Sequence, residues 1–497
     1  MKKSSLAIAV VAALAVAYPG AAWLTGKRLE TKLNKADKND PVLSKFKIVK
    51  QSYKRGVFSS TQEQTFELRV ENLFASTLPN ASSASAFQDN EGEATAEATV
   101  DEQTMPHAMS EPIQISVINH ITHGPFPGMF GVAAGKVETE LVLDPKVLAE
   151  IKKVFGDKKF LQITTLLNYG GGGTMKLSSP DATFNDPNGS TKVEWKGVKA
   201  EIGFDEDYKK FQFNFLTPGF KVTDQKESGN FSIGEMKADG NIDRAFGNSM
   251  LYLGKTTASI ASIEFSSAAI GGFKAGNITL ESDSTAKKDL IDMGIKMGMA
   301  SLKFGEAEFS NFHYDYSLHN IHGDTLSKMS NEFSAVAKTG ATPNEQMQQM
   351  QTIWKKYGME LLKYNPSISL DRLSVSGKSG EFKTNASAKL VGVTEADFNM
   401  PQSILQKLEA EGDLSFAEAL IEEVVNMTQK DPNARAMALT MANATITGFQ
   451  AQGYLTRKEK ALTSHMEWKQ GKASINGKPY PPVMSAAPMP ADAMPQE

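Results

Sequence analysis

The sequence predicts an α+β fold dominated by β structure: an N-terminal transmembrane helix, then a large, mostly antiparallel, twisted sheet with a few packed helices. Three observations predict it. An uncharged apolar run lies near the N-terminus, alternation of apolar and polar residues recurs along most of the chain, and helical spacing is confined to a few stretches. We expect an anchor or signal segment at residues 1–28, a β-rich domain at 29–480 and a disordered tail at 481–497.

The apolar run, Leu6 to Leu24, follows two lysines and ends before Lys27 and Arg28. At about 1.5 Å per residue it makes a helix of roughly 28 Å, close to the bilayer hydrocarbon thickness of about 30 Å. Small residues within the run offer cleavage sites, so a signal peptide is the alternative. The length of the run and the interfacial Trp23 favour a retained anchor, although Pro19 weakens this interpretation. Under either interpretation the apolar run exports the rest of the chain. With the retained anchor, we expect a single-pass inner-membrane protein with its bulk in the periplasm.

The composition excludes several classes of function. Lysine and arginine number 53 against 57 aspartate and glutamate, and a net charge of −4 argues against a nucleic-acid partner, which would need a basic stripe. Hydrophobic residues at 40% and charged residues at 22% fit a folded core and exclude wholesale disorder and a polytopic membrane protein. The absence of cysteine removes disulfides, thiolate metal sites and cysteine nucleophiles.

Alternation at period two predicts strands across the domain. Clear examples are VEWKGVKAEIGF, FNFLTPGFKVTD, ASIASIEF, AEFSNFHYDYSLHNI, LDRLSVSGKSGEFKTNASAKL and TITGFQAQGYLTR. Near the C-terminus, Gln470-Gly471 and Asn476-Gly477 separate alternating segments and predict hairpin turns, because glycine readily takes the positive φ of a tight turn. Neighbouring strands joined by hairpins predict an antiparallel meander.

Helical spacing of apolar residues predicts helices at 325–364 and 401–442, packed on the sheet. In the second region we expect two helices over Pro401 to Gln429, broken near Gly412-Asp413, and a third from Asp431 to Ala442. Residues 80–111 are rich in Ala, Ser, Glu and Thr, which predicts a disordered loop insertion.

Catalytic and metal-binding motifs do not emerge. His120 and His123 have a spacing that suits one metal on a helix, but alternation from Ile115 to Ile121 predicts a strand that points them to opposite faces. The glycines at 170–173 lack the continuation of a phosphate-binding loop and predict a turn. We therefore expect no catalytic residue, no metal and no cofactor.

Two motifs have compositions that strand formation alone does not require: SYKRGVFSS, Ser52 to Ser60, and NHITHGPFPG, Asn119 to Gly128. With AAWLTGKRLE near the N-terminus and ASINGKPY near the C-terminus, they resemble the YdgA-like family of bacterial envelope proteins, known by domain of unknown function 945. The resemblance runs nearly end to end. It implies one N-terminal inner-membrane anchor, a large periplasmic portion and no established activity, and it supplies no catalytic residues.

The motif residues have a structural and a binding interpretation. In the structural one, glycines admit bends, prolines stiffen a turn and two phenylalanines give it an apolar anchor, so that the motifs lock two early strands. In the binding one, Arg55 or His123 holds an anionic headgroup or a partner carboxylate. The structural interpretation is favoured. The residues concerned are Tyr53, Arg55, Gly56, Phe58, His123, Gly124, Pro125, Phe126 and Pro127.

Two classes of function remain. The first is a noncatalytic, membrane-anchored envelope protein that binds proteins, glycans or lipid through an extended β surface or groove, with a homo-oligomer left open; a continuous apolar inner face would support the lipid version. The second is a periplasmic hydrolase whose site is assembled from distant strands, which a pocket with converging histidine and carboxylate groups would support. We favour the first class.

Overall fold

The computed structural model describes residues 22, 27 and 47–480, with gaps at 69–112, 125, 128–131, 144, 187, 225–228, 248–250, 268–270, 306, 338–342, 400 and 430. The expected anchor at 1–28, apart from Ala22 and Lys27, lies outside these residues. The expected loop at 80–111 and the tail at 481–497 lie outside them too. Within the described residues, none of the helices has the length and apolarity that a membrane crossing requires.

The chain divides into two compact units, with unit 1 at residues 1–180 and 201–208 and unit 2 at residues 181–200 and 209–497. Both are built from antiparallel strands, which confirms the β-dominated, antiparallel part of the predicted fold. Strand β9, Val198–Phe204, crosses the division.

Unit 1 is a small sheet whose strands pair in chain order from β1 to β6. Its core is a cluster of Ile121, Ala134, Val137 and Leu167, against which Tyr53 packs. The elements are β1 Lys47–Arg55, β2 Ser59–Leu68, β3 Ile113–His123, β4 Gly135–Val142, α3 Pro145–Phe155, β5 Gln162–Leu167 and β6 Gly173–Ser179.

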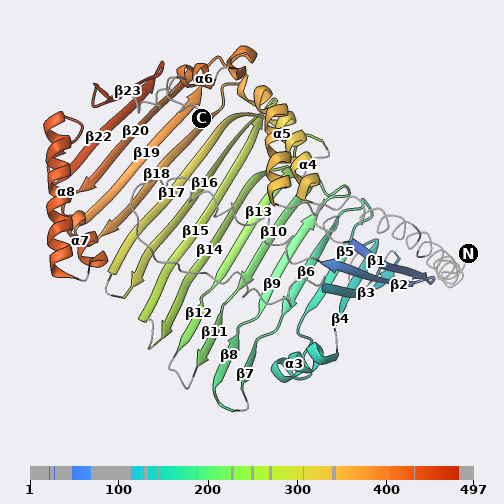
Figure 1. Ribbon diagram of the computed structural model, residues 1–497. Coiled ribbons are helices and arrows are strands. Elements are labelled where there is room, and N and C mark those ends of the chain that lie inside the picture. The colour runs from blue at the N-terminus through green and yellow to red at the C-terminus, as the bar shows by residue number, and fades with distance from the viewer. Residues whose placement is uncertain are drawn as a thin grey trace, which may run out of the picture. The chain divides into compact units, whose positions relative to one another are not determined.

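Unit 2 contains a broad layer in which long strands lie side by side, with helices at strand ends and at one edge (Figure 1). The layer runs β10 Lys210–Thr217, β13 Met236–Arg244, β14 Tyr252–Ser267, β15 Gly271–Lys287, β16 Leu290–Phe304, β17 Ala307–His322, β18 Ser367–Gly377, β19 Gly380–Leu390, β20 Leu408–Ala417, β22 Ala461–Lys469, β23 Lys472–Ile475 and β24 Lys478–Tyr480. Each strand pairs antiparallel with the next.

Shorter elements complete unit 2. Strand β12 pairs with β14 and β11, and β11 pairs with β8, which pairs with β7. The remaining elements are β7 Ala182–Asn185, β8 Thr191–Trp195, β11 Phe220–Asp224, β12 Asn230–Ile233, β21 Thr456–Lys458, α4 Gly323–Ala337, α5 Pro343–Leu362, η4 Glu395–Asn399, α6 Pro401–Lys407, α7 Ala419–Thr428 and α8 Pro432–Gln452.

The two predicted C-terminal hairpin turns are confirmed. Gln470 and Gly471 join β22 to β23 with φ of 51° and 74°, and Asn476 and Gly477 join β23 to β24 with φ of 50° and 75°. Two successive left-handed residues twist the turn to match the flanking strands. The last strands are therefore placed by local turn chemistry.

The prediction of two helices over Pro401 to Gln429 is wrong for the middle of this segment. Residues 408–417 form strand β20, between helices α6 and α7. The segment LEAEGDLSFA places Leu408, Ala410, Leu414 and Phe416 at even positions, which is strand alternation, and Gly412 continues that series instead of breaking a helix. The strand matters for the site, because it brings Glu411 and Asp413 onto the sheet.

The predicted strand TITGFQAQGYLTR is also largely wrong, because α8 continues to Gln452. Its β-branched residues are accommodated in the helix: the Oγ1 atoms of Thr445 and Thr447 donate to the carbonyl oxygens of Met441 and Asn443 at 2.9 and 2.8 Å. The helix ends only at Gly453, whose φ is 78°.

Candidate functional site

The two sequence motifs meet at one end of unit 1. The register pairs Ser59 at the start of β2 with Thr122 near the end of β3, and His123 with Gly135 at the start of β4. One more contact closes this end, where the His123 backbone N–H donates to the carbonyl oxygen of Phe58 at 2.9 Å. Both motifs therefore belong to one structural feature, as the structural interpretation expects.

Two glycines shape this end. The Gly56 N–H donates to the Ser59 carbonyl oxygen at 2.7 Å, and a Cβ added at Gly56 would lie 2.8 Å from that oxygen. Gly124 has a φ of 129°, which side chains disfavour, and its N–H donates to the Ala134 carbonyl oxygen at 3.4 Å. The backbone conformation of both motifs thus depends on glycine.

His123 is buried, with 1% of its surface exposed, and links β3 to the N-terminal stretch. Its Nδ1 lies 2.9 Å from the carbonyl oxygen of Ala22, and its Nε2 lies 3.0 Å from Ser60 Oγ. A carbonyl oxygen only accepts, so Nδ1–H is the donor to Ala22, and in the neutral ring Nε2 accepts from the Ser60 hydroxyl. Burial leaves the His123 ring almost no surface that an anionic headgroup could reach.

His120 confirms the predicted opposite orientation of the two histidines. Its side chain is 55% exposed, and its Nε2 lies 3.6 Å from Glu140 Oε2. The buried His123 lies on the other face of β3. The two rings therefore do not form one metal site.

The other motif residues divide between buried and exposed positions. Tyr53 packs against the core cluster and Pro127 is buried, whereas Arg55 is exposed and Pro125 lies outside the described residues. The two phenylalanines differ from expectation: Phe58 is 45% exposed and Phe126 57%. They do not anchor a turn in the core.

A second candidate surface lies on unit 2, where apolar residues face one another across successive strands. One row in register runs Phe215, Ala238, Ala258, Leu280, Met297, Tyr314 and Leu373. The neighbouring row, nearer the start of β16, runs Ile295, Tyr316, Leu370, Ala386, Gly412 and Met466. A third runs Met293, Leu318, Ile368, Ala388, Ala410 and Trp468. Directly paired residues share a face of a sheet, so these rows form one surface, the apolar face.

The apolar face remains partly open to solvent. Ile368 is 55% exposed, Met466 45% and Leu280 39%. Among the described residues, the helices pack near strand ends: α4 and α5 form a cluster that contacts Ile321, and Leu420 of α7 approaches Gly377. Figure 1 shows these helices beside the layer rather than across its middle.

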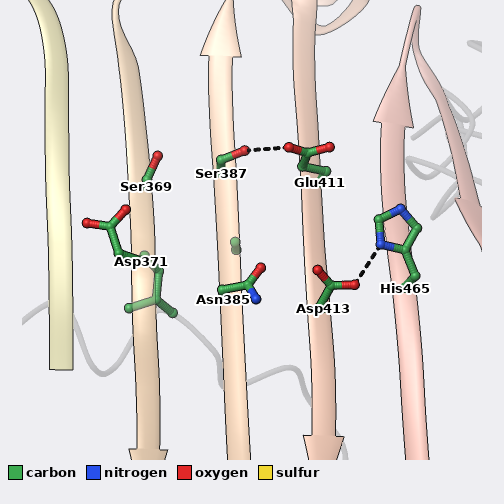
Figure 2. A pocket seen from close by; sticks show the side chains of 9 residues that line it. Ser369, Asp371, Asn385, Ser387, Glu411, Asp413 and His465 are labelled. Carbon is green, nitrogen blue, oxygen red and sulfur yellow. Dashed lines mark hydrogen bonds and ion pairs between the residues drawn. The ribbon is translucent and has the colours of Figure 1, made fainter. Parts of the chain in front are cut away.

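The opposite face of the same strands carries polar residues and a shallow hollow, lined by Ser369, Asp371, Asn385, Ser387, Glu411, Asp413 and His465 (Figure 2). Leu370 and Ala386, from the second row of the apolar face, also line it. Asn385, Asp413 and His465 are paired in register across β19, β20 and β22. The His465 Nδ1 lies 2.8 Å from Asp413 Oδ1, and Ser387 Oγ donates to Glu411 Oε1 at 3.5 Å.

The electrostatics of the hollow are set by the pair of Asp413 and His465. The hydrogen bond that the Asp413 carboxylate accepts from the ring raises the pKa of His465 above its usual value, and Glu467 at 3.6 Å from Nε2 adds to this. Both side chains stay solvated, at 60% exposed for Asp413 and 42% for His465. Because both side chains are solvated, the hollow offers hydrogen-bonding groups but does not exclude water from them.

His319 and His322 make polar contacts near the end of β17. His322 Nδ1 lies 2.7 Å from Thr325 Oγ1, and its ring stacks on Tyr364 at 4.3 Å. His319 Nδ1 lies 3.4 Å from Asp292 Oδ1. Within the described part of the chain, no group of three His, Cys, Asp or Glu side chains is arranged to hold a metal ion.

Together the fold and these surfaces define an antiparallel β protein with a motif-bearing N-terminal unit and an amphipathic sheet. The sequence model of a bacterial protein family of unknown function, DUF945, matches residues 1–483, and the chain belongs to this family. The chain is similar to Protein YdgA of Escherichia coli (strain K12), with 23% identity over 509 residues that cover 96% of this chain and 94% of that protein. The family resemblance of the two motifs is thereby confirmed.

Proposed function

We propose that this protein is a noncatalytic, membrane-anchored envelope protein that binds the acyl chains of lipids along the apolar face of unit 2. The observation that carries the proposal is the in-register continuity of that face from β13 to β22. Contiguous exposed apolar surface on a soluble domain is typical of a binding surface.

The dimensions of the face suit an acyl chain. At about 4.8 Å between neighbouring strands, the rows from β13 to β22 cross roughly 38 Å. One leaflet accounts for half of a hydrocarbon core of about 30 Å, so a lipid chain in a membrane extends about 15 Å. A whole chain therefore fits across the strands with room for a second.

The energy of such binding is adequate. Each buried methylene contributes about 0.8 kcal/mol, so a chain that buries about eight methylenes gains roughly 6 kcal/mol before the entropy of association is subtracted. Methionines at 293, 297 and 466 supply flexible, polarisable side chains that adapt to irregular apolar ligands. Glycans need a polar surface, which the apolar face does not offer.

The N-terminal run from Leu6 to Leu24 supplies the proposed membrane anchor, and export of the remainder follows from it. A protein anchored in the membrane would bind lipid chains next to the bilayer that supplies them. This placement in the envelope, with the bulk of the chain in the periplasm, is part of the proposal.

A hydrolase is the second candidate, because the hollow joins His465, Asp413, Glu411 and Ser387 on one face. The Ser387 hydroxyl donates to Glu411 and not to His465. The histidine and aspartate stay solvated, and a charge-stabilising site gains most from excluding water. We therefore favour binding over catalysis.

The test compares neighbouring residues on opposite faces. The full chain, extracted in mild detergent, carries either Ile368→Glu or Leu280→Glu on the apolar face, and co-purified lipids are quantified by mass spectrometry. Because both side chains are more than a third exposed, the substitutions spare the fold while placing a charge in the path of an acyl chain. We expect bound lipid to fall several-fold.

The matched controls are Ser367→Glu and Thr279→Glu, which place the same charge one residue away on the polar face. They should keep the lipid content of the unsubstituted protein, because lipid that adheres to the anchor contributes equally to all four variants. Equal lipid content in all four variants would contradict the proposed function. Turnover of an ester or glycan substrate that depends on His465 would favour the hydrolase.

A further inference from the structure

The motif end of unit 1 exposes large apolar side chains close together. Val57 is 46% exposed, Phe58 45%, Phe126 57% and Val132 73%. We call these four residues the hairpin patch. They come from the turn between β1 and β2 and from the segment between β3 and β4.

The register brings the two segments of the patch to the same end of the sheet. Phe58 is the residue whose carbonyl oxygen accepts from the His123 N–H at 2.9 Å, and Phe126 follows three positions after His123. Val132 lies two positions before Ala134, whose carbonyl oxygen accepts from the Gly124 N–H at 3.4 Å. The hairpin patch thus depends on backbone hydrogen bonds between separate segments and not on the conformation of a single loop.

The same end contacts Ala22. Ala22, fully buried, accepts a hydrogen bond from His123 Nδ1 at 2.9 Å. Ala22 belongs to the apolar run that ends at Leu24, two residues later, which is about 3 Å of helix rise. In an anchored chain, this level is the boundary between hydrocarbon and headgroups.

We infer that the hairpin patch inserts into the interfacial layer of the lipid bilayer and holds unit 1 against the membrane. The inference rests on the proposed anchor, because the place of Ala22 near the end of the apolar run sets the depth of the hairpin patch relative to the bilayer. Interfacial segments bury apolar side chains such as phenylalanine at the boundary of headgroups and acyl chains, and the exposed Lys54, three positions before Val57, can extend toward anionic headgroups. Burial of the patch accounts for apolar side chains that the protein core does not take up.

The absence of cysteine makes a direct test simple, because a single introduced cysteine is the only labelling site. The full chain carrying Val57→Cys or Val132→Cys is labelled with an environment-sensitive fluorophore and reconstituted into vesicles of phosphatidylethanolamine and phosphatidylglycerol. We expect a blue-shifted emission and several-fold stronger quenching by brominated lipid than at a control position.

The control is Val142→Cys. Val142 is 46% exposed, like Val57, and lies at the opposite end of β4. Thermal unfolding of each variant shows that the fold is kept. Equal quenching at all three positions in protein that floats with the vesicles overturns the inference and leaves the anchor intact. Protein that fails to float overturns the anchor, and the inference with it.

Discussion

Units 1 and 2 use polar and apolar residues in opposite ways. Unit 1 buries a polar network, in which Thr139 donates to Asn119 at 2.7 Å and Asn119 donates to Gln62 at 3.1 Å, while it exposes the hairpin patch. Unit 2 keeps its polar residues on one face and its apolar residues on the other. Specific polar pairs therefore connect the strands inside unit 1, whereas the apolar face of unit 2 follows from alternation along each strand.

This difference predicts where single substitutions act most strongly. In unit 1 the buried side chains of His123 and Ser60 are partners, so loss of one leaves the other without its hydrogen bond. In the layer of unit 2, conservative changes on the apolar face alter the surface without removing a partner. The predictions below test this contrast, beginning with the largest effect.

We predict that His123→Ala lowers the free energy of unfolding of unit 1 by about 3 kcal/mol. The substitution removes two hydrogen bonds, leaves the Ser60 hydroxyl buried without its partner and opens a cavity. Amide hydrogen exchange of β2 and β3 measures the change. His120→Ala, on the exposed face of the same strand, should stay within about 0.5 kcal/mol. Similar losses for the two variants would refute the distinction between the faces.

A smaller loss is expected for Gly56→Ala. The new Cβ would lie 2.8 Å from the Ser59 carbonyl oxygen, so the hairpin must shift, at about 1–2 kcal/mol. Gly170→Ala is the control, because no heavy atom lies within 4 Å of its added Cβ. Urea unfolding of the two variants gives the comparison. The steric account fails if Gly56→Ala is as stable as Gly170→Ala.

The smallest effect concerns pH and unit 2. Because Asp413 raises the pKa of His465 in the folded state, the pair stabilises the fold fully below the ordinary histidine pKa of 6.5. That contribution is lost as pH rises through the higher, folded-state pKa. With both side chains exposed it should amount to less than about 1 kcal/mol. Titration of His465 by NMR in Asp413→Asn should show a lower pKa; an unchanged pKa would mean that Asp413 is not the cause.

Local patterns in the sequence were sufficient for much of the fold. Alternation predicted β3, and with it the opposite orientation of His120 and His123. Asn476-Gly477 predicted a turn because its chemistry is local. The failures at β20 and α8 arose where two local signals competed. Gly412 suggested a helix break but continues the alternation of a paired strand, and the β-branched residues of α8 suggested a strand although they lie in a helix.

The candidate surfaces were harder to predict, because they depend on register between distant segments. Asn385, Asp413 and His465 come together only once β19, β20 and β22 are aligned, and the strand assignment of β20 was missing. The alternation in LEAEGDLSFA was the available signal. Likewise, each strand of the apolar face alternates on its own, but only pairing shows that the rows continue.

The most direct test of the central claim is photo-crosslinking on the two faces of β15 in intact membranes. A photoreactive phenylalanine analogue replaces Leu280, on the apolar face, or Thr279, its neighbour on the polar face. Binding of acyl chains predicts that irradiation attaches lipid to the protein at position 280 and not at position 279, as measured by intact-protein mass spectrometry. Lipid attachment at neither position, or equally at both, would contradict the account.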